Sequence, residues 1–264
     1  MKEKAKAAIP VIINADDFGY SQKTNTCIFT AAQKRCISSA TIMANGPALR
    51  DALALLPGLP QLSFGVHLNL TEFSPVLPTA ELKAAGLVDA DGTFLGNAFR
   101  QLRPSPRLLE ACYQELKQQL LSLYEKGLRP SHLDSHHHIH TIPWLLPVIW
   151  KLQQKYKIYR LRNTLNVYQL PSAEASRLKL LAAKRLWQVA SVLLGSKMTQ
   201  RFSSVQIFLA NPYRSEFSRA SSIELMCHPG QAGFEAETQQ LLRGGETVLP
   251  EGFRLVNYPE MLSA

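Results

Sequence analysis

Short runs of apolar residues alternate along the chain with stretches whose apolar positions recur every three or four residues. Runs of the first kind are typical of buried strands, and stretches of the second kind are typical of helices that bury one face. The pattern predicts strands at 11–14, 38–45, 62–70, near 132–136, 158–163 and 221–230. It predicts helices at 23–35, 47–56, 107–127, from about Pro143 and at 173–195, and leaves 202–210 open between strand and helix.

This alternation of strands and helices predicts βα units arranged around a parallel sheet or barrel. The chain has 264 residues, which suits one large α/β domain, and no internal repeat or low-complexity linker divides it. We therefore expect a single domain over 1–264. Residues 72–104 show little regular pattern, and a loop of this length is commonly a lid or a binding loop.

Composition and charge restrict the classes of partner. Apolar residues make up 46% and charged residues 19% of the chain, and no apolar run approaches the ~20 residues of a membrane span, so we expect a soluble protein. The net charge of +9 favours anionic partners, but the sequence lacks a basic stripe interleaved with aromatic residues, so nucleic-acid binding is not expected. The densest basic stretch, 177–201, predicts an amphipathic helix packed on the body, with contact to a membrane surface as the alternative.

The N-terminus and the cysteines predict a reducing compartment. MKEKAK is basic, but the apolar run after it is short and lacks a cleavage site, so no export signal is expected. Cys27, Cys36, Cys112 and Cys227 lie far apart in sequence and show no CxxC spacing. We expect free thiols and a cytoplasmic protein.

Candidate chemistry gathers where apolar runs end. Asp16 and Asp17 follow the first predicted strand, His67 lies in the third, and Asp134 and His136 lie in the strand near 132–136. Because the carboxyl ends of the strands form the active face of an α/β barrel, these side chains can converge. One Asp with two His is the ligand set of an open divalent-metal site.

Each of these groups also has a structural interpretation. The tract HLDSHHHIH (132–140) holds five of the seven histidines. In a strand, alternate residues of the tract would lie on one face, whereas in a helix His136 and His140 would lie side by side as a metal-binding pair. The third alternative is a hydrogen-bonded cluster that binds no metal. Taken alone, His67 is better explained as a structural histidine. The two adjacent aspartates repel each other if both are buried and ionised, which favours a cation, although one of them could cap the following helix.

Six motifs resemble the ordered motif set of the YdjC family of carbohydrate deacetylases. They are IINADDFG (12–19), Asn25, SSATIMANG (38–46), GVHLNLT (65–71), RPSHLDSHHHIH (129–140) and ELMCHPG (224–230). The resemblance covers about 11–230. HLDSHHHIH is similar to the chito-oligosaccharide (ChbG-type) branch of the family rather than to the hopanoid-linked (HpnK-type) branch.

The resemblance implies an irregular (β/α) barrel, TIM-barrel-like and similar to that of polysaccharide deacetylases, with one divalent ion, Mg²⁺ or Zn²⁺. Carried over by position, the implied metal ligands are Asp17, His67 and His136. Asp16 is implied as the catalytic base and His228 as the general acid.

Further residues receive supporting roles through the same resemblance. Asp134 and His138 are expected to support the ligands or contact substrate, and Arg160 or Arg162 is expected to orient Asp16. Cys36 stands where the family generally has a turn glycine, and TEFSP (71–75) replaces the more typical Thr-x-Gly-x-Pro, so substrate specificity is less directly inherited than metal binding.

The expected activity is hydrolysis of the amide bond of N-acetylated amino sugars by water that the metal activates. Alternatives are a metal-dependent phosphoesterase, a deacetylase of a lipid-attached amino sugar, and a non-catalytic protein that binds anionic surfaces. Family members are commonly dimeric, so a homodimer is expected. The chain has no GxSxG motif and no cysteine in a reactive context, so a covalent serine or cysteine mechanism is not expected.

Overall fold

The computed structural model describes residues 7–167, 174–243 and 248–262, and its description of side chains in the second range begins at residue 181. In the described residues all strand pairs are parallel and form one sheet in the order β4-β3-β2-β1-β6-β5, with β7 beside the N-terminal end of β1. The strands are β1 Ile9–Phe18, β2 Ser39–Ile42, β3 Ser63–Leu68, β4 Leu133–Ser135, β5 Arg201–Ser204, β6 Ile223–Cys227 and β7 Phe253–Leu255.

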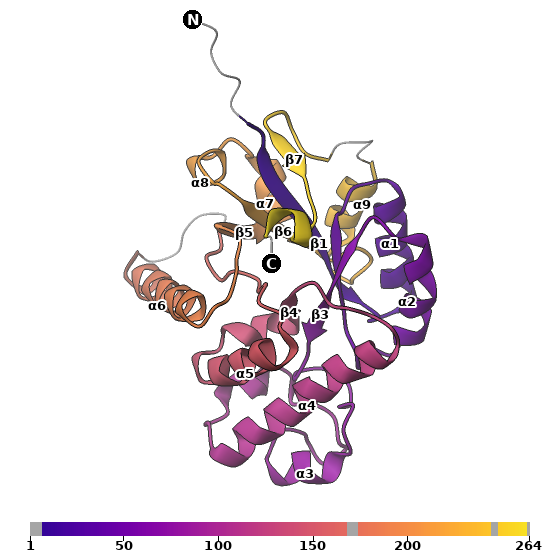
Figure 1. Cartoon of the computed structure of the whole chain (residues 1–264), viewed down its shortest axis with the longest axis vertical. Coiled ribbons are helices and arrows are strands. Elements are labelled where there is room, and N and C mark those ends of the chain that lie inside the picture. The colour runs from indigo at the N-terminus through magenta and orange to yellow at the C-terminus, as the bar shows by residue number, and fades with distance from the viewer. Residues whose placement is uncertain (1–6, 168–173, 244–247, 263–264) are drawn as a thin grey trace, which may run out of the picture.

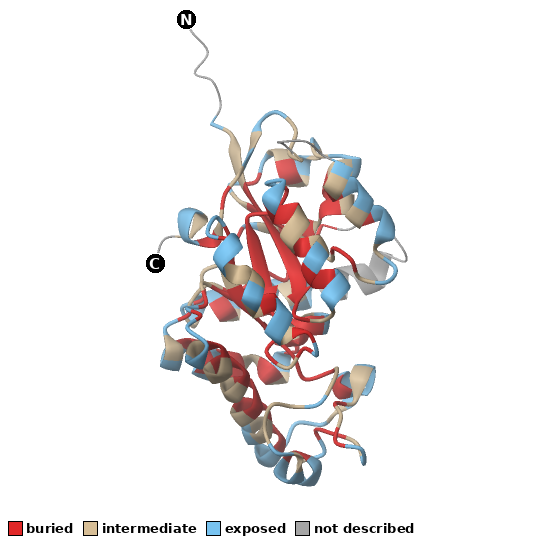
Figure 2. Ribbon diagram, turned by 90° about the vertical axis from the view of Figure 1, so that its right-hand side faces the viewer, coloured by how far each residue is buried: buried red, intermediate tan, exposed pale blue. Residues whose placement is uncertain are grey.

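Helices surround this sheet, whose central strands are buried (Figures 1 and 2). The α-helices are α1 Gln22–Gln33, α2 Leu49–Leu55, α3 Thr79–Ala84, α4 Pro106–Glu125, α5 Leu146–Tyr156, α6 Glu174–Leu193, α7 Val205–Ala210, α8 Ser215–Ser218, α9 Glu235–Arg243 and α10 Tyr258–Met261. The 3₁₀ helices are η1 Leu56–Gly58, η2 Gly96–Gln101, η3 His136–Thr141 and η4 Pro143–Leu145.

The sheet is curled, and residues 160–166 close it irregularly. Isolated bridges join Leu161 to Leu133 of β4 and Asn166 to Phe202 of β5, so this segment lies between the two edge strands. The expected irregular (β/α) barrel is thereby confirmed. Parallel strands hold their carboxyl ends at one side of such a barrel, and the candidate residues follow those ends.

Local signals account for most of the predicted helices. Ser21 and Ser105 cap α1 and α4, each accepting a hydrogen bond from a backbone N–H of the first turn. The prediction of α4 at 107–127 is confirmed to within two residues. The segment 202–210, left open from the sequence, contains both β5 and α7.

Several predicted elements were wrong. Residues 158–163 form two isolated bridges rather than a strand, since only Leu161 pairs with a strand residue, Leu133 of β4, while Arg160 pairs with Lys197. The long segment 72–104 is not a plain loop, since it contains α3 and η2. Residues 221–230 do not contain the last strand of the sheet, because the short β7 follows and pairs with β1.

The basic helix predicted at 173–195 is α6. Its described part buries Trp187 and Ser191 against the body, as expected for a packed helix, but leaves Leu186, Val189, Val192 and Leu193 exposed. The side chains of Arg177 and Lys179, which entered the prediction, lie outside the described residues.

Two further expectations concern thiols and membrane spans. All four cysteines are free, and Cys36, Cys112 and Cys227 are buried. None of the helices in the described ranges has the length and hydropathy needed to cross a membrane.

Candidate metal and active site

A bulge at the end of β1 brings both neighbouring aspartates to the same side of the sheet. The register of β1 against β2 shifts between Ala15 and Phe18, and Asp17 has a left-handed backbone with φ of 67°. Successive residues of a regular strand point to opposite faces, and a bulge removes that alternation. Asp16 and Asp17 therefore both line one pocket of about 500 Å³.

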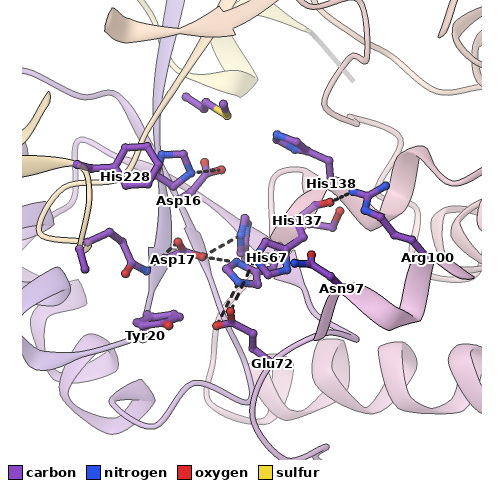
Figure 3. A pocket seen from close by; sticks show the side chains of 16 residues that line it. Asp16, Asp17, Tyr20, His67, Glu72, Asn97, Arg100, His137, His138 and His228 are labelled. Atoms are coloured by element: carbon purple, nitrogen blue, oxygen red, sulfur yellow. Dashed lines mark hydrogen bonds and ion pairs between the residues drawn. The ribbon is translucent and has the colours of Figure 1, made fainter. Parts of the chain in front are cut away.

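One carboxylate oxygen of Asp17 lies close to two imidazole rings (Figure 3). This oxygen, Oδ1, lies 3.1 Å from Nε2 of His67 and 2.8 Å from Nδ1 of His136. The other oxygen, Oδ2, accepts a hydrogen bond of 2.9 Å from Gln231. All three candidate ligands are buried, and one donor atom of each lies within 4.8 Å of the other two.

The far side of His67 is held by a carboxylate. His67 and Asp134 are register partners on β3 and β4, and His67 Nδ1 lies 2.8 Å from Asp134 Oδ1. Thr41 of β2 donates to Asp134 Oδ2 at 3.0 Å. When Nδ1 carries a proton, the lone pair of Nε2 points towards Asp17. A histidine that donates one ring N–H to a carboxylate and presents its other nitrogen to an ion is characteristic of metal sites.

The charge at this cluster fits a cation. Burial lowers the pKa of His67, but the carboxylates of Asp134 and Asp17 outweigh burial and raise it to about 10. Two carboxylates on either side of one imidazole thus stabilise positive charge at Nε2, which a proton or a metal ion supplies. A carboxylate with two imidazoles suits zinc and other transition ions, and the residues present therefore fit a divalent metal.

Asp16 has a different set of partners from Asp17. Arg162 donates to both Asp16 oxygens, at 2.6 and 2.7 Å, and Asn14 donates to Oδ1 at 2.9 Å. Burial raises the pKa of Asp16, but the Arg162 guanidinium outweighs burial and holds that pKa well below its usual range. Arg162 is fully buried and also bonds Asp134 at 2.9 Å and Glu224 of β6 at 2.6 Å. Arg160, the other candidate, instead donates to backbone carbonyls at Ser131 and Leu262.

His228 follows β6 and lies beside Asp16 in the pocket (Figure 3). Its Nε2 lies 3.8 Å from Asp16 Oδ2, and its ring lies 4.3 Å from that of Phe234. Burial lowers the pKa of His228. A carboxylate and an imidazole beside a candidate metal site are groups that can move protons during hydrolysis.

The histidine tract divides into two groups. His136, His137 and His138 line the pocket, because η3 begins directly after β4 and the backbones of His137 and His138 are left-handed. His132 stacks on Tyr258 at 3.6 Å, and His140 bonds Ser135 at 2.5 Å. Neither the continuous strand nor the helical pair of His136 and His140 forms, because β4 ends at Ser135.

The structure narrows two alternatives that the sequence left open. The aspartates do not cap α1, since Ser21 does. Asp134 is fully buried behind His67 and is not among the residues that line the pocket, which favours support of a ligand over contact with substrate as its role.

Sequence reasoning missed several residues of the pocket. Glu72 lies 3.4 Å from His136 Nε2, Gln231 bonds Asp17, and Asn97 and Arg100 come from η2. The sequence could have indicated two of these residues, because Glu72 directly follows the GVHLNLT motif and Gln231 directly follows CHPG. Glu224 is the first residue of the ELMCHPG motif, but it received no predicted role, because it resembles an ordinary polar position in an apolar strand.

The fold and this cluster define an irregular parallel α/β barrel with an open metal-type site at the carboxyl ends of its strands. A family model described as YdjC-like protein matches residues 10–251. The chain belongs to the YdjC-like family.

Curated relatives resemble a part of the chain. A carbohydrate deacetylase of Brevibacillus brevis is 36% identical over 148 residues, which cover 56% of this chain and 57% of that protein. Carbohydrate deacetylases of Halalkalibacterium halodurans and Vibrio cholerae are 37% and 40% identical over 149 residues, 56% of this chain and 61% and 56% of theirs. The matched stretches thus span less than two thirds of these relatives.

A solved structure is similar over nearly the whole chain. It is described as a cellobiose-phosphate cleavage protein from Enterococcus faecalis V583 and has a TM-score of 0.75 at 25% identity. The match covers 97% of this chain and 100% of that one, which supports the barrel-like fold.

Proposed function

We propose that this protein is a divalent-metal-dependent hydrolase that removes N-acetyl groups from amino sugars, with chito-oligosaccharides as the substrate class. The observation that carries the proposal is the convergence of Asp17, His67 and His136 beside Asp16 and His228 in one pocket. The similarity to carbohydrate deacetylases supports the reaction type. A substrate from the chito-oligosaccharide branch rests on the HLDSHHHIH motif.

Asp17, His67 and His136 would hold the ion, whose identity, zinc or magnesium, the ligands leave open. When bound, a divalent ion supplies Lewis acidity, which polarises the acetyl carbonyl and acidifies the attacking water. Asp134 would keep a proton on His67 Nδ1, so that Nε2 is the nitrogen that binds the ion in place of its own proton.

Asp16 and His228 would move the protons. Asp16 is a weak base because of Arg162, and it can therefore accept a proton only from strongly acidified water. Its Oδ2 lies 3.8 Å from His228 Nε2, so a proton gained from water can pass to the imidazole and on to the departing nitrogen. The products would be acetate and a free amino sugar.

The proposal is tested by acetate release from N-acetylglucosamine oligomers by the metal-loaded protein. Asp16→Asn should reduce the rate constant kcat by on the order of 100-fold or more while the protein retains its metal. Asp51→Asn, which changes an exposed aspartate on α2, is the matched control and should leave the rate unchanged.

A phosphate-release assay on sugar phosphates runs in parallel, because a phosphoesterase would use the same ligands. Phosphate release without acetate release would contradict the deacetylase and favour the phosphoesterase. Acetate release only from a lipid-attached amino sugar would instead assign the lipid-linked substrate.

A further inference from the structure

His228 presents one nitrogen to the pocket and turns the other towards the interior. Nε2 faces Asp16, whereas Nδ1 is buried and has no hydrogen-bond partner among the described residues. An unpartnered buried polar atom costs about 1 to 3 kcal/mol, so such an atom in a candidate catalytic residue calls for a physical reason.

The side chain behind His228 is Glu237 of α9. It is 1% exposed, and its Oε1 accepts a hydrogen bond of 2.6 Å from the backbone N–H of His228. The same oxygen lies 3.9 Å from His228 Nδ1. The second oxygen, Oε2, is also buried without a partner in the described part of the chain.

Two complementary groups therefore face each other at slightly more than hydrogen-bond distance. The backbone bond holds the carboxyl in place, and a small rotation of the carboxyl or the ring would join Glu237 to Nδ1. Catalytic hydrogen bonds are often long before substrate binds and shorten in the complex. Neither His228 Nδ1 nor Glu237 Oε2 has a hydrogen-bond partner among the described residues that would compete for this contact.

We propose that Glu237 is a positioning residue that shares a proton with His228 Nδ1 and thereby keeps Nε2 directed at the substrate nitrogen. This inference rests on the proposed function, in which His228 donates a proton to the departing amine.

The proton balance of the step is simple. Asp16 takes a proton from water as the oxygen–carbon bond forms, and that proton passes to His228 Nε2. Nε2 donates it to the amide nitrogen as the carbon–nitrogen bond breaks. Nδ1 keeps its proton towards Glu237 throughout, so the step needs no further reactant.

The charges around the pair suit a shared proton. Burial raises the pKa of Glu237 to about 7, although the backbone N–H of His228 opposes this rise, and burial lowers the pKa of His228. A raised pKa of the carboxyl and a lowered pKa of the imidazole bring the proton affinities of the two groups closer together, which suits a hydrogen bond between Nδ1–H and Glu237. The other charged groups that act on His228 are Asp16, Asp17, Arg162 and His67.

The test is the protonation of His228 in metal-free protein labelled with ¹⁵N-histidine, measured by nuclear magnetic resonance. His228→Asn identifies the signals of the residue. The wild type should show a proton on Nδ1, and Glu237→Gln should shift the tautomer towards Nε2–H and lower the pKa of His228 by about one unit or more. Glu235→Gln, on the exposed side of α9, is the matched control and should change neither.

Activity gives the second readout. Glu237→Gln should lower kcat by on the order of 100-fold and shift the pH profile, with KM within about twofold of wild type. Glu237→Asp should recover part of the rate, which a purely structural role would not predict. Unchanged tautomer and pKa in Glu237→Gln would overturn the proposal, as would an altered tautomer with unchanged kcat. If wild-type protein releases no acetate, the proposed function fails, while the resonance measurement still decides whether the pair exists.

Discussion

At the scale of single residues, two adjacent aspartates acquire different properties from their partners. Asp17 faces two imidazoles, while Asp16 is held by Arg162 through both oxygens. The left-handed backbone of Asp17 makes this separation possible, because it turns both side chains to the pocket. The environment therefore suits Asp17 to the proposed metal site and Asp16 to the proposed proton transfer.

Arg162 provides a residue-scale prediction about stability. It is fully buried and pairs with Asp16, Asp134 and Glu224, so Arg162→Met would leave three buried carboxylates without their cation. We expect the free energy of unfolding to fall by about 3 to 5 kcal/mol, measured by urea denaturation.

The control is Glu110→Gln, which breaks the exposed pair with Lys151 and should cost less than about 1 kcal/mol. Equal stability of Arg162→Met and wild type would show that the carboxylates take up protons without cost, against the low pKa assigned to Asp16.

At the scale of elements, strand ends position the site and helices support it from behind. β1, β3, β4 and β6 each carry or precede a pocket residue, and α9 supplies the carboxyl behind His228. α6 supports the histidine tract, since Trp187 packs edge-on against His140 with ring centroids 5.8 Å apart.

Trp187→Ala tests the packing of α6. The side chain is 5% exposed, and its removal should lower the free energy of unfolding by about 3 to 5 kcal/mol in urea denaturation. Leu193→Ala on the same helix is the control, because Leu193 is 82% exposed and should change stability by about 0.5 kcal/mol or less. Comparable losses in both variants would mean that the exposed face of α6 is also covered in solution.

At the scale of the whole molecule, several ionisable side chains are enclosed in the barrel. Burial lowers the pKa of His132, His138 and His140, in His138 to about 3. These histidines stay neutral in the folded protein while the unfolded chain binds protons near pH 6.5. Their contribution to stability is therefore present above pH 6.5 and is lost as the pH falls.

Metal-free protein should accordingly lose stability between pH 6.5 and 4, by up to about 1.4 kcal/mol per pH unit for each of these histidines. His67, with its raised pKa, is protonated in the folded protein throughout this window, so its opposite contribution is confined to the top of the window, where the unfolded chain is still taking up its proton. Urea denaturation at several pH values measures the slope, and His138→Asn should reduce it. A free energy of unfolding that stays constant from pH 7 to 5 would disprove the assignment.

Much of the fold and part of the site could be predicted from the sequence. Buried parallel strands can be recognised as apolar runs, and their carboxyl ends lie on one side of the barrel. The positions of Asp16, Asp17, His67 and His136 at or near those ends were therefore enough to predict that these side chains converge. The bulge at Asp17 and the left-handed turn at His137 could not be predicted, because tertiary packing imposes these conformations on residues other than glycine.

The roles of Glu224 and Glu237 could not be predicted, for a related reason. Their importance depends on contacts with Arg162 and His228, which lie 62 and 9 residues away along the chain. A glutamate in an amphipathic helix normally faces solvent, and only the packing of α9 against the end of β6 buries Glu237.

The central claim is that Asp17, His67 and His136 bind one divalent ion while Asp16 does not. Isothermal titration calorimetry of metal-free protein with zinc, and then with magnesium, tests it most directly. We predict one ion per chain for wild type, Asp16→Asn and the control Asp51→Asn, and binding weakened by at least about 100-fold in Asp17→Asn. Wild-type binding of zinc or magnesium that survives in Asp17→Asn, or no binding of either ion by wild type, would contradict the account.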